Sequence, residues 1–131
     1  MSSIFSKIIK GEIPSYKIGE TETAYAFLDI SPLHIGHTLV VPKREVDYLF
    51  DLPEADYLSL MSFSKVVAQA VGKAIPCERV GVAVIGLEVP HAHVHLVPIN
   101  NVSDIDFSRA KMQFPAEEME AVALKIASYI N

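Results

Sequence analysis

Cysteine, basic residues and long apolar runs are all scarce in this sequence. The single cysteine, Cys77, cannot form a disulfide within the chain, so we expect a small buried side chain that is compatible with a reducing compartment. The net charge of -5 gives no basic surface for nucleic acid, and an anionic ligand must therefore be attracted by a local arrangement of residues. The longest apolar stretch, VGVAVIGLEVP, is too short to cross a bilayer and carries Glu88. Because lysines also interrupt the apolar residues at the N-terminus, we expect a cytoplasmic protein with no membrane or nucleic-acid partner.

The chain is long enough for one modest hydrophobic core, because half of its 131 residues are hydrophobic. It contains no repeat, no low-complexity segment and no linker rich in glycine, serine or proline. We therefore predict a single domain over residues 1–131.

Apolar residues near the N-terminus follow a helical period. Ile4, Ile8 and Ile9 recur at helical spacing, and glycine and proline follow as stop signals, which predicts a short amphipathic helix. Residues 22–31 and 36–44 then resemble two strands joined by the turn-prone segment SPLHIG. The shortness of this link makes the pair antiparallel.

The principal helix is predicted over residues 51–75. Asp51 and Glu54 have capping-box spacing at its start, and Pro76 follows its end. Its apolar positions are Leu58, Met61, Val67, Ala70 and Val71.

The remaining segments complete an α+β pattern. Residues 79–86 and 92–99 are rich in β-branched side chains and are expected to pair as strands. A terminal helix is predicted near 115–130, with Pro115 at its start. The expected fold is an antiparallel sheet of about five strands with two main helices and a short N-terminal helix.

Three of the five histidines occupy every second position of the stretch PHAHVHLVP, residues 90–98. In a strand near 91–97, successive side chains alternate between the two faces of a sheet. His91, His93 and His95 would then project from one face, while the apolar residues between them project from the other into the core.

Three interpretations of this histidine row are open from the residues alone. The side chains could be solvated on the outer face of a half-buried sheet, although such faces usually carry threonine, lysine, glutamate and serine. They could ligate a metal, with a further ligand from Cys77, Glu88 or His37. They could also act in catalysis, with one imidazole as the nucleophile and its neighbours orienting it.

Electrostatic repulsion limits the protonation of this row. Neighbouring rings on one strand face lie about 6.7 Å apart at Cβ, and two unit charges at that distance repel by roughly 2.5 kcal/mol at an effective dielectric constant of about 20. At least one imidazole therefore stays neutral and nucleophilic near pH 7, while another can carry a proton for a leaving group.

The stretch HAHVHLV resembles the His-φ-His-φ-His-φ-φ motif of the histidine triad (HIT) family of nucleotide hydrolases and transferases. The segments IFSKIIKGEIPSYKI and AYAFLDISPLHIGHTLVVPKR are similar, in order and separation, to the Hint-like branch of that family. Together these segments cover most of residues 3–98. The resemblance implies a HIT-like fold, a homodimer and a small-molecule nucleotide substrate, with no cofactor and no metal held by the triad.

The resemblance also implies roles for four histidines. His93, the middle one, would attack the α-phosphorus and form a nucleotidyl-histidine intermediate that water then resolves. His95 would contact the phosphate and the leaving group, and His91 would orient the nucleophile. His37, in GHTLVVPK, matches the family's additional histidine beside the triad, although as a bare sequence feature it could equally be a polar strand end.

In similar proteins an apolar slot with one carboxylate binds the base and the ribose. The matching positions are Ile4, Phe5, Ile8, Phe27, Asp29 and Ile30. The Asp29 carboxylate can accept hydrogen bonds from both ribose hydroxyls, and isoleucine and phenylalanine side chains can sandwich a purine ring. The residues alone favour simple core for the apolar positions and a turn cap for Asp29, so this assignment rests on the resemblance.

Two departures from the family pattern concern metal and phosphate binding. Ser3 and Ser6 stand where many Hint-like proteins have cysteines that bind a structural zinc, so no zinc is expected there. In AVIGLEVPH, Leu87 and Glu88 replace a glutamine and a serine or threonine that normally bind the phosphate and the leaving group, whereas Val89 is retained.

Glu88 would bring a second carboxylate towards an anionic phosphate. At a separation of about 5 Å the repulsion would cost roughly 3 kcal/mol at an effective dielectric constant of about 20. Either this side chain points away from the site, as most glutamates lie at the surface, or it takes up a proton and donates to the leaving group in place of the missing hydroxyl.

The predicted function is hydrolysis of a nucleoside 5′-monophosphate derivative, either a phosphoramidate or a dinucleoside polyphosphate. Two alternatives stay open. The chain could be a non-catalytic nucleotide-binding or regulatory module that keeps the triad, or a metal-dependent hydrolase. The leaving group and the preferred base are not specified by the sequence.

Overall fold

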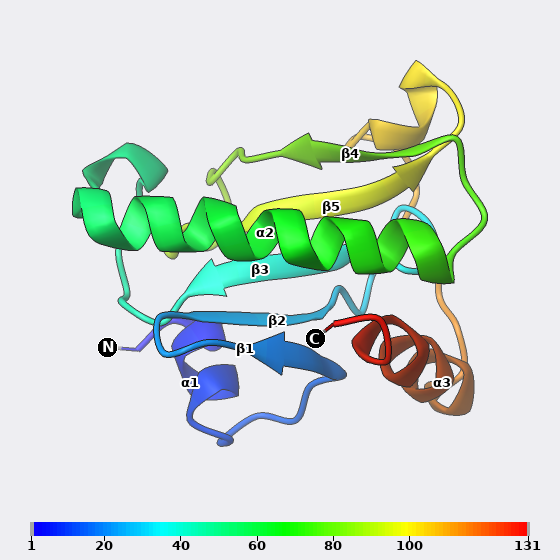
Figure 1. Cartoon of the computed structure of the whole chain (residues 1–131). Coiled ribbons are helices and arrows are strands. Elements are labelled where there is room, and N and C mark those ends of the chain that lie inside the picture. The colour runs from blue at the N-terminus through cyan, green and yellow to red at the C-terminus, as the bar shows by residue number, and fades with distance from the viewer. Residues whose placement is uncertain (1, 131) are drawn as a thin grey trace.

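Within residues 2–130, which the computed structural model describes, five antiparallel strands form one sheet and three α-helices pack around it (Figure 1). The strands lie in the order β1-β2-β3-β5-β4. They are β1 Lys17–Glu20, β2 Ala24–Leu28, β3 Thr38–Pro42, β4 Arg79–Ala83 and β5 Val94–Ile99. The helices are α1 Ile4–Ile9, α2 Glu54–Ala74 and α3 Ala116–Ala127, with short 3₁₀ turns η1 Leu49–Asp51 and η2 Val102–Ile105.

Strand β2 is buried on both faces, which explains its run of apolar residues. Ala24, Ala26 and Leu28 belong to the core beneath α2 and α3, whereas Tyr25 and Phe27 belong to a separate apolar cluster. Because successive strand residues point to opposite faces, these two clusters lie on opposite sides of the sheet.

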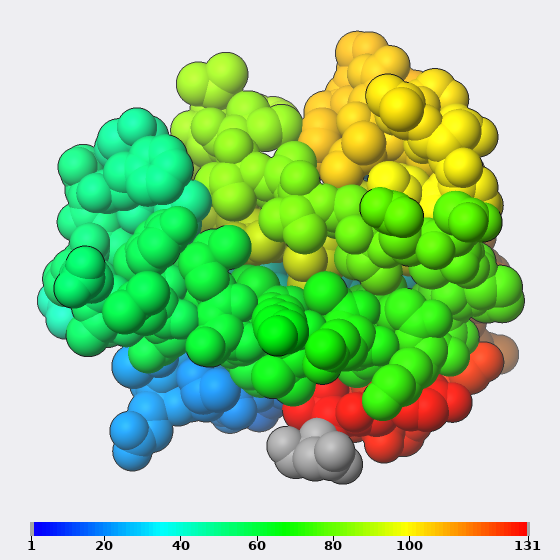
Figure 2. Space-filling model, turned by 45° about the horizontal axis from the view of Figure 1, so that its top comes forward, coloured from blue at the N-terminus to red at the C-terminus, as the bar shows by residue number. Residues whose placement is uncertain are grey.

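Helix α2 lies along one face of the sheet, roughly in line with the strands, and Figure 2 shows it in green with α3 in red beside it. Its buried side chains are Leu60, Phe63, Ser64, Val67, Ala70, Val71 and Ala74. Helix α3 contributes Met119, Ala123 and Ile126 to the same core. No helix in residues 2–130 combines the length and apolar composition that crossing a membrane requires.

The short helix α1 covers the other face of the sheet. The side chain of Ser3 caps the helix by accepting a hydrogen bond from the Ser6 amide over 3.0 Å. The cluster on this face, here called the α1 cluster, consists of Phe5, Ile8, Tyr25, Phe27, Leu39 and Val41. A helix of six residues therefore covers the apolar side chains that β2 and β3 present on this face of the sheet.

A glycine fixes the turn that leads into β3. Gly36 has a φ of 90°, and a Cβ atom there would lie 2.7 Å from Cγ1 of Ile75. Both the left-handed backbone and the close approach exclude a larger residue. His37 follows immediately, so this turn determines where that imidazole enters the sheet.

The structure confirms the α+β fold, the antiparallel sheet of five strands and the short N-terminal helix. The last two predicted strands do pair, with Arg79 opposite Ile99 and Ala83 opposite His95. Strand β1 was not located by the sequence analysis, because its four residues, KIGE, contain two charges and a glycine and show no apolar alternation.

Three local predictions were wrong. Asp51 does not cap α2, because it ends η1, and Pro53 stands at the N-cap with no side-chain hydrogen bond. Leu58 is not on the buried face of α2, since 58% of it is exposed. Cys77 is only partly buried, and this partial burial raises the pKa of its thiol.

Candidate active site

Four histidines gather on the sheet face beneath α1, and all four are buried. His37 directly precedes β3, and His95 lies in β5 opposite Leu39 of the α1 cluster. His91 and His93 lie just before β5, which begins at Val94 and not near residue 91. Their exposed fractions run from 0% at His91 to 8% at His95, so the solvated-face interpretation is wrong. Buried imidazoles need defined partners.

The side chains of residues 91–96 alternate between the two faces of the sheet as predicted, even though β5 begins at Val94 and not near residue 91. Ala92, Val94 and Leu96 are all buried in the core beneath α2. The histidines between them face the other way, because side chains in extended chain alternate.

A backbone amide determines the positions of the protons on His37 and His95. The Leu33 amide lies 3.0 Å from Nδ1 of His37, so this nitrogen must be an unprotonated acceptor. The neutral His37 ring then carries its proton on Nε2 and donates to Nδ1 of His95 over 3.0 Å. The proton of a neutral His95 is consequently on Nε2, where it is available to a ligand.

His93 has the opposite arrangement. Its Nδ1 lies 2.8 Å from the carbonyl oxygen of His91, and a carbonyl can only accept, so Nδ1 carries the proton and Nε2 keeps its lone pair. The Phe5 ring packs edge-on against the His93 ring, with centroids 5.0 Å apart. The ring centroids of His93 and His95 are 4.8 Å apart, so a nucleophilic nitrogen and an N–H donor stand side by side.

Burial lowers the pKa values of His37, His91 and His95, so these three rings are neutral at physiological pH. It lowers the pKa of His37 to about 3, and the neighbouring His95 adds to the effect. It lowers the pKa of His95 to about 4, with further contributions from His93 and Lys111. The pKa of His91 is also lowered by burial, although its hydrogen bond to the Pro42 carbonyl opposes the shift.

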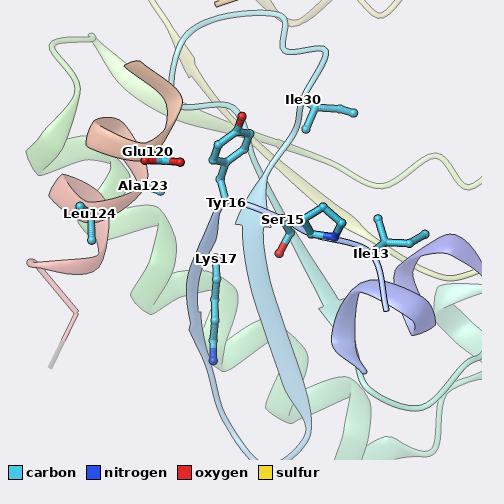
Figure 3. Close-up of a pocket in the computed structure, with 9 residues that line it drawn as sticks. Ile13, Ser15, Tyr16, Lys17, Ile30, Glu120, Ala123 and Leu124 are labelled. Carbon is cyan, nitrogen blue, oxygen red and sulfur yellow. The ribbon is translucent and has the colours of Figure 1, made fainter. Parts of the chain in front are cut away.

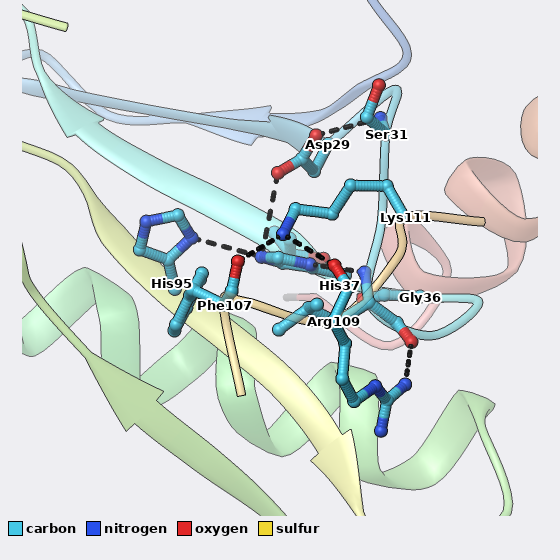
Figure 4. Close-up of polar contacts among 10 residues, drawn as sticks. Asp29, Ser31, Gly36, His37, His95, Phe107, Arg109 and Lys111 are labelled. Carbon is cyan, nitrogen blue, oxygen red and sulfur yellow. Dashed lines mark hydrogen bonds and ion pairs between the residues drawn. The ribbon is translucent and has the colours of Figure 1, made fainter. Parts of the chain in front are cut away.

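Asp29 completes this group (Figure 4). One carboxylate oxygen lies 3.7 Å from Nε2 of His37, and the other accepts a hydrogen bond from the Ser31 amide over 2.9 Å. Burial raises the pKa of Asp29. Asp29, His37 and His95 each offer one possible metal-ligand atom, and these three atoms lie within 4.8 Å of one another. His37 and His95, however, each already use one ring nitrogen in the hydrogen bond between them.

His91 is held by α1. Its Nε2 donates a hydrogen bond to the Pro42 carbonyl over 2.7 Å. Its Nδ1 is therefore an acceptor, and the Ser3 hydroxyl donates a hydrogen bond to it over 2.7 Å. The Glu45 carboxylate accepts from the Ser3 amide over 2.7 Å and from the Ser6 hydroxyl over 2.6 Å. These two hydrogen bonds lower the pKa of Glu45. Ser3 therefore joins the start of α1 to His91, and Glu45 holds both Ser3 and Ser6 in place.

The family model for the HIT domain matches residues 10–102, which include His37, His91, His93 and His95. The chain belongs to the HIT family. Adenosine 5′-monophosphoramidase of Schizosaccharomyces pombe is 32% identical over 137 residues, and the match covers 100% of both chains. The adenosine 5′-monophosphoramidase of Saccharomyces cerevisiae is 39% identical over 100 residues, covering 72% of this chain and 61% of the yeast protein.

Solved HIT structures share the whole architecture. A HIT-like protein of Bartonella henselae, described as involved in cell-cycle regulation, has a TM-score of 0.86 and is 30% identical. The superposition covers 98% of this chain and 96% of that one. The fold expected from the triad motif is therefore shown along nearly the full chain.

The residues predicted to bind the base divide into two groups. Phe5, Ile8 and Phe27 are buried together in the α1 cluster, and Val89 packs against it. Ile4 and Ile30 are exposed, by 49% and 71%, and do not belong to that cluster. In this HIT protein the first group packs behind the histidines and the second is exposed, and the role of both groups in binding the base stays a prediction.

A groove of about 680 Å³ lies beside Ile30 (Figure 3). Residues 13–17 form one wall, and Glu120, Ala123 and Leu124 of α3 form the other. The four histidines do not line it. Ile30, the residue after Asp29 in the chain, lines this groove.

Leu87 and Glu88 lie on the exposed segment after β4. Leu87 is 88% exposed, and Glu88 is exposed as well. The Glu88 charge contributes to the raised pKa of Asp29, so it acts on the histidine side of the molecule. Its two interpretations, an outward-pointing residue or a proton donor, both stay predictions.

The sequence analysis missed two contributors to the site. Glu45 supports α1 from the loop after β3, and a charged residue in a polar loop gives no signal of that role. Phe107 lies in a segment without periodicity, yet its ring centroid is 4.6 Å from that of His95. The sequence did give one signal for the role of Ser3. By the resemblance, Ser3 takes the position of a zinc-binding cysteine, and in the structure its hydroxyl lies 2.7 Å from Nδ1 of His91.

Replacing Ser3 by alanine should destabilise the protein. Ser3→Ala removes the α1 cap and leaves the buried Nδ1 of His91 without its donor, so the free energy of unfolding should fall by about 1–3 kcal/mol. Ser2→Ala is the matched control, because Ser2 is exposed and should change it by less than about 0.5 kcal/mol. Urea unfolding of both variants measures the difference, and equal effects would contradict the role of Ser3.

The neutral histidines should make stability depend on pH. Because the pKa values of His37 and His95 are depressed in the folded state to about 3 and about 4, the unfolded chain binds more protons below its histidine pKa of about 6.5. Their contribution is complete above that pH and is lost as the pH falls towards 4, by up to about 1.4 kcal/mol per pH unit for each ring. Urea unfolding at pH 7.5, 6.5 and 5.5 should show the fall, with a smaller slope in His37→Gln. An identical slope in wild type and variant would contradict the assignment.

Proposed function

We propose that this HIT protein hydrolyses nucleoside 5′-monophosphate derivatives, phosphoramidates or dinucleoside polyphosphates, through a nucleotidyl-histidine intermediate. The observation that carries the proposal is the pairing of an unprotonated Nε2 on His93 with an Nε2–H on His95, in rings 4.8 Å apart. The coarser conclusion, a nucleotide hydrolase, is supported by membership of the HIT family and by relatives named adenosine 5′-monophosphoramidase.

In the first step the lone pair on Nε2 of His93 attacks the α-phosphorus. A nitrogen–phosphorus bond forms, and the bond from phosphorus to the leaving nitrogen or oxygen breaks, with its electron pair going to the leaving atom. The Nε2–H of His95 donates a hydrogen bond to that atom, which takes its proton from solvent, because a neutral imidazole is too weak an acid to give up its N–H. The positive charge that develops on the His93 ring is paired with the negative charge of the phosphate.

In the second step water attacks the phosphorus and displaces Nε2 of His93. The water releases one proton to solvent, which replaces the proton taken up by the leaving group, and its oxygen stays on the nucleotide. The carbonyl of His91 holds the Nδ1 proton of His93 throughout, so the nucleophile keeps its orientation. In this proposal the Asp29 carboxylate accepts hydrogen bonds from the ribose hydroxyls.

Two other functions are separable from this one. Exposed Leu87 and Glu88 in place of the family's polar residues favour a non-catalytic nucleotide-binding module, which would bind AMP without turnover. A metal-dependent hydrolase would use the ligand atoms of Asp29, His37 and His95, and its activity would be lost on treatment with a chelator.

The test of the proposed function is turnover of adenosine 5′-phosphoramidate by His93→Ala. Losing the nucleophile should remove turnover, with less than about a tenth of the rate remaining, because covalent catalysis contributes several kcal/mol to the transition state. AMP affinity should stay within about tenfold, since the lone pair contributes little to ground-state binding. His95→Ala should slow turnover most for substrates with poor leaving groups.

The outcomes of this experiment separate the candidates. Substantial turnover by His93→Ala would disprove the nucleophile assignment. AMP binding by a wild-type protein that turns over no substrate would favour the non-catalytic module. Loss of wild-type turnover with a chelator would favour the metal-dependent hydrolase.

We also propose that the protein is a homodimer that pairs through β4. Strand β4 is an edge of the sheet, and an edge strand presents unpaired backbone groups. Val82 pairs with Leu96, so it points to the α2 side of the sheet, where it is 55% exposed. Leu58 of α2 is also exposed, by 58%, so both β4 and α2 carry exposed apolar side chains that a second copy would bury.

The dimer should appear in light scattering as a mass of two chains at micromolar concentration. Val82→Glu places a charge at the proposed contact and should give a monomer. Val66→Glu is the matched control, because Val66 is 41% exposed on α2 but lies beside the β1–β2 turn. A wild-type monomer, or a dimer that survives Val82→Glu and not Val66→Glu, would refute this interface.

A further inference from the structure

The segment that follows η2 covers the outer side of the His37 and His95 pair. Residues 106–112, here called the Phe107 loop, have no helix or strand. The Phe107 ring centroid lies 4.6 Å from that of His95 and 6.2 Å from that of His37. The loop therefore contacts the two rings that control the position of the proton donor.

The Phe107 loop is anchored to the turn that precedes β3. Arg109 donates to the Leu33 carbonyl over 2.9 Å, and the Met112 amide donates to the Pro32 carbonyl over 2.9 Å. The Leu33 amide is the donor that fixes His37. The loop and the His37 ring are thus positioned by the same turn, and the loop is a built part of the site.

Lys111 extends from this loop towards the histidines (Figure 4). Its ammonium donates to the Phe107 carbonyl over 2.7 Å and to the Arg109 carbonyl over 3.3 Å, and it lies 5.9 Å from the Phe107 ring centroid. These bonds use two of its three N–H donors. The side chain is exposed, so the third donor is open to a ligand.

Binding an anionic phosphate beside His37 and His95 requires a positive charge, because the carboxylates near these rings are negative. Asp29 and Glu88 bring negative charge to the site, and the net charge of the chain is -5. His37 and His95 are neutral, so they offer no positive charge to a phosphate. The positive charge of Lys111 acts on Asp29, His37 and His95 alike, which places it within electrostatic range of all three.

We propose that Lys111 binds the phosphate of the nucleotide and compensates for Leu87 and Glu88, which stand where relatives have polar phosphate-binding residues. The inference rests on the proposed function in one respect, namely that the ligand is a nucleoside 5′-phosphate. When the nucleotide binds, the Lys111 ammonium donates a hydrogen bond to a phosphate oxygen. It does so either with its third N–H or in place of one of its two hydrogen bonds to the loop carbonyls. The Phe107 loop is then a phosphate-binding element that the triad motif does not include.

The test compares AMP with adenosine, two ligands that differ by the phosphate alone. Isothermal titration calorimetry should show that Lys111→Ala weakens AMP binding by about tenfold or more, as expected for a charge-assisted hydrogen bond, while adenosine affinity is unchanged. Lys111→Arg should retain most of the AMP affinity, because the charge remains. Lys125→Ala is the matched control, since it removes the same charge from an exposed position on α3 and should leave both affinities unaltered.

Each alternative result has a defined meaning. Unchanged AMP affinity in Lys111→Ala would overturn the inference, and so would an equal loss for AMP and adenosine, which would indicate a disturbed loop. If wild-type protein binds AMP and does not hydrolyse the phosphoramidate, the proposed function fails while a selective loss of AMP binding in Lys111→Ala still supports the inference. A wild-type protein that does not bind AMP would overturn both.

Discussion

The hydrogen bond from the Leu33 amide to Nδ1 of His37 is the interaction on which the chemistry of the site depends. A backbone N–H can only donate, so it forces the His37 proton onto Nε2, and that proton in turn forces the His95 proton onto its own Nε2. No carboxylate is needed to select these tautomers. The turn that supplies the amide is itself constrained by Gly36, whose left-handed backbone leaves no room for a side chain beside Ile75.

A second set of contacts acts from the opposite end of the row. Ser3, Ser6 and Glu45 hold α1 against His91, and Phe5 from the same helix packs against His93. In the resemblance drawn from the sequence, these two serines take the positions of zinc-binding cysteines. Here neutral hydroxyls and one carboxylate join the same two parts of the chain, so the attachment of α1 uses hydrogen bonds between side chains of the protein itself.

Much of the fold and the histidine row could be predicted from the sequence, because they follow from short-range patterns. The alternation around His93 identifies both a strand-like segment and the face that carries the chemistry, and the helical spacing of Ile4 and Ile8 locates α1. The contributions of Glu45 and Phe107 could not be predicted, since each acts through a contact between distant segments and lies in a loop without periodicity. The exposure of Ile30, against the burial of Phe27 in the α1 cluster, likewise depends on contacts between distant segments and not on local pattern.

The attachment of α1 has a consequence for how the protein folds. Ser3 and His91 are separated by 88 positions in the chain, and their hydrogen bond joins the start of α1 to the segment that leads into β5. Closing so long a loop costs entropy before any contact compensates for it, so such long-range contacts tend to form late on a folding pathway. During synthesis on the ribosome, the first helix can pack on β2 and β3 early, but its link to His91 must wait until the histidine row has been made. The histidine face is therefore among the last surfaces of this domain to be completed.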